Sequence, residues 1–325
     1  MESTSVRNKI LYIVVPCYNE EEVLPETSRR LKEKLAALVA SGTVSERSRV
    51  LFVNDGSRDA TWSIIERLHE EGPCFSGLNL SRNRGHQNAL LAGLTAACEL
   101  ADVTISMDAD LQDDINAVDE MLEKYYGGCD IVYGVRSSRK RDTFFKRATA
   151  QGFYKLMRSM GADTVYNHAD YRLMSRRAVE ALCEFRERNL FLRGIVPQIG
   201  FKSDVVYYER GDRFAGESKY PLKKMLAFAI DGITSFSVKP IKLITLIGFL
   251  MFLASIVMAV VFIVQWAMGT TVIGWASLIC SVWAIGGLIL LSLGVIGEYI
   301  GKMYVETKAR PRFIVESLLD DNKKE

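Results

Sequence analysis

Two patterns of apolar residues divide this chain. Over roughly the first 135 residues, short apolar runs alternate with longer segments in which apolar residues recur every three to four positions. This alternation is typical of β-α-β units that build a mostly parallel sheet. It predicts strands at Ile10–Val15, Arg49–Asn54, Phe75–Leu80, Val103–Met107 and Asp130–Gly134, and helices at Glu21–Val39, Asp59–Glu70, His86–Glu99 and Ile115–Tyr126.

The second pattern is continuous hydrophobicity. Residues 243–266 and residues 272–297 contain no charged side chain, and each segment is longer than the about 20 residues that a helix needs to cross about 30 Å of hydrocarbon. Positive charge collects on the cytoplasmic side of membrane proteins. Basic residues stand before the first segment and after the second, at Lys239, Lys242, Lys302, Lys308, Arg310 and Arg312. We therefore expect two transmembrane helices in the inner (cytoplasmic) membrane, with both chain ends in the cytoplasm.

The predicted organisation has four parts. Residues 1–212 form the cytoplasmic α/β domain, residues 213–240 a loop and an amphipathic juxtamembrane helix, residues 241–300 the two membrane helices, and residues 301–325 a cytoplasmic tail. In the amphipathic segment, Pro221–Phe236, apolar residues at helical spacing stand beside lysines. Two interpretations stay open, a helix on the membrane surface and a helix packed against the α/β domain.

Composition excludes some other classes. With 41 Lys and Arg against 39 Asp and Glu, the formal net charge is only +2, which argues against a nucleic-acid-binding protein with a broadly basic surface. The six cysteines form no C-x-x-C pair and the three histidines are scattered, so we expect reduced thiols and no zinc site. The polar N-terminus lacks the apolar stretch of a signal peptide.

Two carboxylates directly follow the fourth predicted strand, in Asp108-Ala109-Asp110-Leu111-Gln112. If this segment is extended, alternate side chains share a face, so Asp108 and Asp110 can hold one divalent cation, with Gln112 as a third oxygen ligand. The alternative is that both aspartates simply face water. No G-x-G-x-x-G follows the first strand and no P-loop motif occurs, which disfavours hydride transfer and P-loop hydrolysis.

Polar residues also follow the other predicted strands, where open α/β sheets bind ligands. Tyr18, after the first strand, is suited to cover a flat base, and Asp55, after the second, is suited to accept a hydrogen bond from a ring N–H. Ordinary turn chemistry is the alternative for both. After the fifth strand, the segment Arg136–Arg147 holds six basic residues in twelve, which indicates either a phosphate clamp or a solvated loop.

Asp170 is a further candidate. It stands in Asn167-His168-Ala169-Asp170-Tyr171-Arg172. We expect either a base-like or acceptor-orienting role there, or a structural role in which Asp170 holds Arg172 or a loop.

Four motifs in this order carry a resemblance: Val14–Glu20, Val53–Ser57, Asp108–Gln112 and Gly216–Tyr220. Together they resemble the polyprenyl-phosphate glycosyltransferases, inverting enzymes of the GT-A family 2 type. The bacterial bactoprenol glucosyltransferases are the most similar members, and the dolichyl-phosphate mannose synthases are related. The resemblance extends over the whole chain, including the paired C-terminal spans. One departure is Asp113-Asp114, which stands where the family often has a residue followed by proline.

The resemblance implies a GT-A (Rossmann-like) fold, and the resemblance together with the residue arguments assigns roles to particular residues. Catalytic roles fall on Asp108, Asp110 and Asp170. Nucleotide-sugar binding falls on Pro16, Tyr18, Glu20, Asp55, Asp108, Arg213, Ser218 and Lys219. Acceptor phosphate binding falls on Arg136, Arg139 and Arg147, and Mg²⁺ or Mn²⁺ is held by Asp108, Asp110 and Gln112.

The expected activity is transfer of one hexose from a UDP-sugar to undecaprenyl phosphate, with glucose as the preferred assignment of the sugar. The product is a lipid-linked sugar for a flippase and a downstream transferase, and small residues in the spans permit a homo-oligomer. Two alternatives remain. One is transfer of another sugar, either mannose from GDP-mannose or a modified pentose. The other is a non-catalytic membrane scaffold that binds nucleotide-sugars.

Overall fold

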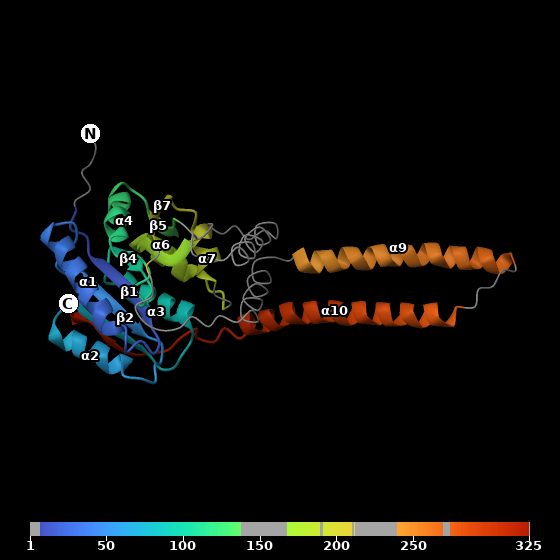
Figure 1. The fold of residues 1–325 in the computed structure, drawn as a ribbon, viewed down its shortest axis with the longest axis horizontal. Coiled ribbons are helices and arrows are strands. Elements are labelled where there is room, and N and C mark those ends of the chain that lie inside the picture. The colour runs from blue at the N-terminus through green and yellow to red at the C-terminus, as the bar shows by residue number, and fades with distance from the viewer. Residues whose placement is uncertain are drawn as a thin grey trace. The chain divides into compact units, whose positions relative to one another are not determined.

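The computed structural model describes residues 7–137, 168–188, 191–209, 211, 239–268 and 274–324 (Figure 1). The chain divides into two compact units. The described residues up to Gly211, together with those from Arg310 onward, belong to the first unit. The described residues from Lys239 to Ala309 belong to the second.

One eight-stranded sheet organises the first unit, in the order β7-β5-β6-β4-β1-β2-β3-β8. Only β6 and β8 pair antiparallel with their neighbours, so the other six strands share one direction. The strand bounds are β1 Leu11–Cys17, β2 Arg49–Asn54, β3 Phe75–Leu80, β4 Val103–Ser106, β5 Ile131–Arg136, β6 His168–Ser175, β7 Ser203–Tyr208 and β8 Val315–Leu319. The predicted α/β, mostly parallel sheet is confirmed.

Helices link these strands, and their bounds are α1 Leu24–Ala40, α2 Thr61–Glu71, α3 His86–Cys98, α4 Ala117–Tyr126, α6 Arg176–Glu184, α7 Leu192–Ile195 and the 3-10 helix η1 Val196–Ile199. The five strands and four helices expected from the apolar pattern are all present. The largest shift is at α1, which begins at Leu24 instead of Glu21. Pro25 falls in its first turn, where the missing N–H of proline has no partner to lose.

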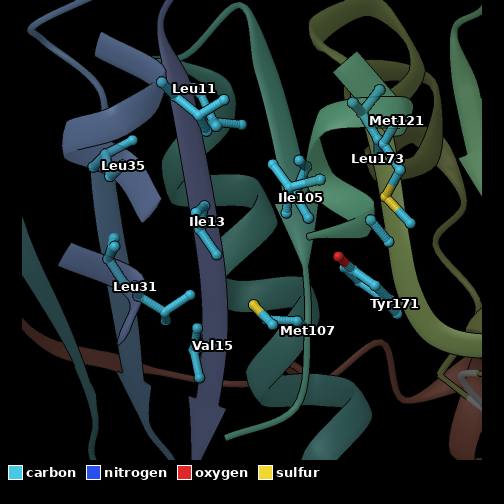
Figure 2. Packing of buried hydrophobic residues seen from close by; sticks show 14 of the residues in the cluster. Leu11, Ile13, Val15, Leu31, Leu35, Ile105, Met107, Met121, Tyr171 and Leu173 are labelled. Atoms are coloured by element: carbon cyan, nitrogen blue, oxygen red, sulfur yellow. The ribbon is translucent and has the colours of Figure 1, made fainter. Parts of the chain in front are cut away.

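The core packs on both faces of β1, whose seven residues are all buried. Figure 2 shows Leu11, Ile13 and Val15 of this strand near Leu31 and Leu35 of α1. A strand covered on both faces reads as a continuous apolar run instead of an alternation. This burial explains why the sequence Leu-Tyr-Ile-Val-Val was recognisable as a central strand.

The last residues of the chain return to this sheet. The segment 301–325 was predicted as a tail, but within it β8 pairs antiparallel with β3, with Gly77 opposite Leu319 and Leu78 opposite Leu318. A five-residue strand with two adjacent leucines gives only a weak alternating pattern, so the sequence alone did not reveal it. The sheet therefore contains a strand contributed from beyond the long apolar segments.

Two long helices form the described part of the second unit: α9 Lys239–Ala267 and α10 Trp275–Thr307, which contact each other. They contain the apolar segments predicted as membrane spans. Among residues whose side chains are described, one stretch, Ile285–Thr307, is long and apolar enough to cross a membrane. The second span stays a prediction, as does the amphipathic helix at Pro221–Phe236, which lies outside the described residues.

Candidate active site

The site is built at one edge of the sheet. The six strands that share a direction all end at this edge, and the antiparallel strand β6 begins there. The residues after β1, β2 and β4 and the first residues of β6 therefore converge. This topology brings together Tyr18, Asp55, Asp108 and Asp170, all of which were predicted as site residues.

The loops after β1 and β2 are joined by hydrogen bonds. The Asn19 amide donates to Ser57 Oγ at 3.0 Å, and the Arg58 amide donates to Asn19 Oδ1 at 2.9 Å. The Glu20 amide donates to Thr61 Oγ1 at 2.9 Å. These contacts fix the backbone directly after Tyr18, a residue that follows Pro16 and Cys17 at the strand end and is 42% exposed. A ring held in this way is available to cover a planar ligand.

Asp55 supports the loop that follows β3. Its carboxylate accepts hydrogen bonds from the Arg84 amide at 2.7 Å and the Gly85 amide at 2.9 Å. Burial raises the pKa of Asp55, and these two hydrogen bonds oppose the rise. At the next position, a Cβ on Gly56 would lie 2.5 Å from the backbone of Arg82. The two loops are therefore in direct contact, and the predicted contact of Asp55 with a nucleobase stays a prediction.

The expected extended geometry after β4 is wrong. The strand ends at Ser106, a turn follows at Ala109 and Asp110, and Leu111 has a left-handed φ of +58°. Asp110 Oδ1 accepts a hydrogen bond from the backbone N–H of Gln112 at 3.2 Å. Carboxylates following a strand tend to capture nearby amides in this way. The alternation argument for a shared face of Asp108, Asp110 and Gln112 therefore no longer applies, although their oxygens remain the donor type that Mg²⁺ and Mn²⁺ prefer.

Asp108 lies among other ionisable groups. Its Oδ1 is 3.5 Å from Nε2 of His86, the first residue of α3, and 36% of its side-chain surface is exposed. Removal from bulk water raises the pKa of Asp108 to about 6; His86 opposes this rise, and repulsion from Asp113, Asp170 and Asp110 adds to it. Negative charge is thus concentrated at the strand edge. Across the part of the chain that the structure describes, no group of three or more His, Cys, Asp or Glu side chains forms a metal site.

Asp170 is held between two arginines. Its Oδ1 lies 2.7 Å from Arg172 Nη2, and its Oδ2 lies 3.0 Å from Arg193 Nη2 and 3.8 Å from His86 Nε2. Burial alone would raise the pKa of Asp170, but the charges of Arg193 and Arg172 outweigh it and hold this pKa well below its ordinary range. The contact between Asp170 and Arg172 that the structural alternative requires is present, and a role of Asp170 in catalysis stays a prediction. A carboxylate with so low a pKa is a weak base.

Arg136 ends β5 beside an acidic group. Its Nη2 is 3.6 Å from Asp113 Oδ1, and its Nε donates to the Tyr208 hydroxyl at 3.3 Å. The Tyr208 hydroxyl in turn donates to Asp113. Asp113 belongs to the Asp-Asp pair that departs from the family pattern, and here it faces Arg136. The other predicted phosphate-binding residues, Arg139 and Arg147, lie outside the described residues, as do Arg213, Ser218 and Lys219.

Two residues of this site, His86 and Arg193, were missed from the sequence, and Arg172 was expected only as a structural partner of Asp170. His86 had a usable signal, because it follows the polar loop Ser81–Gly85 at the end of a predicted strand. Arg172 stands two residues after Asp170, on the same side of a strand. Arg193 lies on α7, a four-residue helix with no periodic pattern, so only the fold places it here.

A family model described as "Glycosyl transferase family 2" matches residues 12–183. The match runs from β1 into α6 and includes Tyr18, Asp55, His86, Asp108 and Asp170. The chain belongs to glycosyl transferase family 2. This family 2 chain is a glycosyltransferase.

Family 2 relatives match nearly the full length. The chain is 54% identical to "Uncharacterized glycosyltransferase YkoT" of Bacillus subtilis (strain 168), over 94% of this chain and 91% of that protein. It is 41% identical to the bactoprenol glucosyl transferase of Shigella phage SfX, over 94% of this chain and 98% of that protein. It is 39% identical to a prophage bactoprenol glucosyl transferase homolog of Escherichia coli (strain K12), over 94% and 97%.

Proposed function

We propose that this glycosyltransferase is an inverting membrane enzyme that transfers one hexose, glucose, from UDP-glucose to undecaprenyl phosphate. The names of two relatives that match at 41% and 39% identity over nearly the full length support the acceptor and the sugar. The apolar stretch Ile285–Thr307 of α10 supports placement at a membrane. The lipid-linked product is suited to a flippase and a second transferase across the inner membrane.

The observation that carries the proposal is the concentration of carboxylates at the strand edge. Repulsion among Asp108, Asp110, Asp113 and Asp170 contributes to the raised pKa of Asp108, and a bound cation would relieve it. Asp108 and Asp110, with Gln112, would hold Mg²⁺ or Mn²⁺, whose charge would offset the negative charge that develops on the departing diphosphate. Oxygen donors of this type fit either ion.

The protein's own groups bind and orient the donor. Tyr18 covers the uracil ring, and Pro16, Glu20 and Asp55 belong to the loops that hold the uridine. The hydrogen bonds between the loops after β1 and β2 give this half of the site a fixed shape before the donor binds. Preorganisation of this kind lowers the cost of ordering the site around the ligand.

The transfer itself is a single displacement at the anomeric carbon. An oxygen of the acceptor phosphate forms the new bond to this carbon as the bond to the UDP oxygen breaks, which inverts the configuration. A phosphomonoester has a second pKa of about 6 and is mostly dianionic near pH 7, so a separate base is unnecessary. Asp170, with its low pKa, orients Arg193 and Arg172 instead of accepting a proton.

The acceptor side is assigned to Arg136, Arg139 and Arg147. Arginine pairs well with a phosphate because its planar guanidinium presents several donors at once. Arg136 ends β5 at the same edge as the carboxylates, so a phosphate beside it would face the donor site. In this arrangement Asp113 holds Arg136 in place until the acceptor binds.

The test is transfer by the full chain purified in detergent, with labelled UDP-glucose, undecaprenyl phosphate and either Mg²⁺ or Mn²⁺. We expect a labelled glucosyl lipid of inverted configuration, identified by mass spectrometry and by NMR of the anomeric proton. Parallel reactions with GDP-mannose and a UDP-pentose test the other sugars. If only one of those donors supports transfer, its sugar replaces glucose in the proposal. If no donor gives a labelled lipid, with or without metal, the proposal is overturned.

A further inference from the structure

A second basic site lies away from the carboxylates, within the first unit. A cavity of about 270 Å³ is bounded by α3, by the residues that follow α6 and by the residues that follow α10. Three arginines line it, Arg186, Arg188 and Arg312, and none of its described lining residues is acidic. A site with this charge and volume suits one phosphate group and is smaller than most pockets for drug-sized ligands, which begin at about 300 Å³.

Apolar side chains complete the wall. Phe185 and Phe313 line the cavity together with the arginines, and so does Leu91 of α3. Arg312 donates a hydrogen bond to the Phe185 carbonyl oxygen, which joins the segment after α10 to the segment after α6. The cavity therefore offers cationic groups and an apolar surface together, which is the combination that a phospholipid requires.

The covalent chain sets an upper limit on the distance between Arg312 and the end of the apolar span. The stretch Ile285–Thr307 ends five residues before Arg312, and five extended residues reach at most about 18 Å. If Thr307 lies at the membrane interface, Arg312 is within reach of the lipid headgroups. Basic pockets beside membrane helices on the cytoplasmic side bind anionic headgroups.

We propose that Arg186, Arg188 and Arg312, with Phe185 and Phe313, form a binding site for the phosphate of an anionic phospholipid. None of its described lining residues is assigned to the donor or the acceptor site. The inference shares with the proposed function only the membrane placement of α10. It uses neither the sugar donor nor the polyprenyl acceptor.

Lipid binding to the full chain in detergent tests this proposal. The probes are fluorescent phosphatidylglycerol and fluorescent phosphatidylcholine, which share the phosphate but differ in net charge. We expect the wild type to prefer phosphatidylglycerol. We expect the double variant Arg186→Gln/Arg188→Gln to bind it at least about tenfold more weakly, since two of the three basic residues that would pair with the anionic headgroup are lost. The control, Arg29→Gln/Arg67→Gln, removes the same charge from α1 and α2 and should bind as the wild type does.

Several outcomes would overturn the site. Equal affinity of the double variant and the wild type for phosphatidylglycerol is one. Displacement of the lipid by inorganic phosphate at low millimolar concentration is another, because it would assign the cavity to a soluble phosphate. If the double variant does not fold, Arg186→Gln alone is used, since this side chain is exposed, and unchanged affinity there would have the same meaning. The binding assay contains no sugar donor, so a failed transfer reaction leaves its result intact.

Discussion

The hydroxyl of Tyr12 donates to the carboxylate of Asp320, at 3.0 Å from Oδ2, although 308 residues separate them. Tyr12 lies on the central strand β1, and Asp320 directly follows the edge strand β8. The Asn322 side chain donates to the same hydroxyl at 2.8 Å. This contact fastens the end of the chain, beyond α10, to the middle of the sheet.

Removing the hydroxyl by Tyr12→Phe should destabilise the first unit. The substitution leaves the buried carboxylate of Asp320 without this donor, and loss of a partner by a buried polar group costs on the order of 1–3 kcal/mol. We expect a lower unfolding temperature for the full chain in detergent. Tyr207→Phe is the control, since that ring is 66% exposed. Equal unfolding temperatures for the two variants would contradict a stabilising role of this contact.

Asp170→Asn should cost far more stability than removal of a surface carboxylate. The substitution leaves Arg172, which is 1% exposed, without its charged partner, and breaking a buried ion pair costs on the order of 3–5 kcal/mol. In the control, Asp204→Asn, the lost pair with Lys124 is at the surface, so the free energy of unfolding should hardly change. Denaturant unfolding measures both.

The Asp170 pair also predicts a direction of pH dependence. Because the pKa of Asp170 is lower in the folded chain than in the unfolded chain, its ion pairs stabilise the fold above the unfolded pKa of about 3.9. This contribution is lost as the pH falls through the still lower folded pKa. The difference in unfolding free energy between wild type and Asp170→Asn should therefore be constant near neutral pH and narrow only in strong acid. A difference that narrows already near pH 6 would contradict the low pKa.

Two glycines with similar backbone angles provide a matched test of the loop contact. Gly56 and Gly42 have φ of +62° and +68°, but a Cβ would meet the Arg82 and Asn83 backbone only at Gly56, whereas Gly42 has open space. Gly42→Ala should cost about 1 kcal/mol from backbone strain alone. Gly56→Ala should also move the loop after β3 and raise the KM for the donor. Equal effects of the two substitutions on KM would show that this contact does not shape the donor site.

Much of the first unit was predictable because its central strands are buried on both faces. The apolar runs Arg49–Asn54 and Phe75–Leu80 match the observed strands at both ends. The antiparallel strands β6 and β8 were not predicted, since both depend on pairing partners far away in the sequence. Pairing of β4 with β6 joins residues about 70 positions apart, and pairing of β3 with β8 joins residues about 240 apart.

The sequence predicted which residues form the site better than it predicted how they are arranged. Tyr18, Asp55 and Asp108 meet because the ends of parallel strands meet, and this follows from the β-α-β pattern alone. Asp170 joins them from the beginning of the antiparallel strand β6, which that pattern does not predict. The turn at Asp110 did not follow from the sequence, because it depends on a left-handed φ at Leu111, and leucine rarely adopts this conformation. The low pKa of Asp170 depends on Arg193, which only the folded chain brings near.

Asp110→Asn should nearly abolish transfer if Asp110 ligates the metal. The amide keeps the size of the side chain but removes its negative charge, and loss of one electrostatic contact to the transition state costs on the order of 10²–10³ in kcat. Chelation of the metal by EDTA should reduce the wild type to a similar level, and added Mg²⁺ or Mn²⁺ should restore the wild type but not the variant. Asp119→Asn is the control, because this aspartate lies on α4, paired with Lys34 at the surface. Near-normal kcat in Asp110→Asn, with an unchanged response to EDTA, would remove Asp110 from the metal site and leave Asp108 as the carboxylate on which the donor side depends.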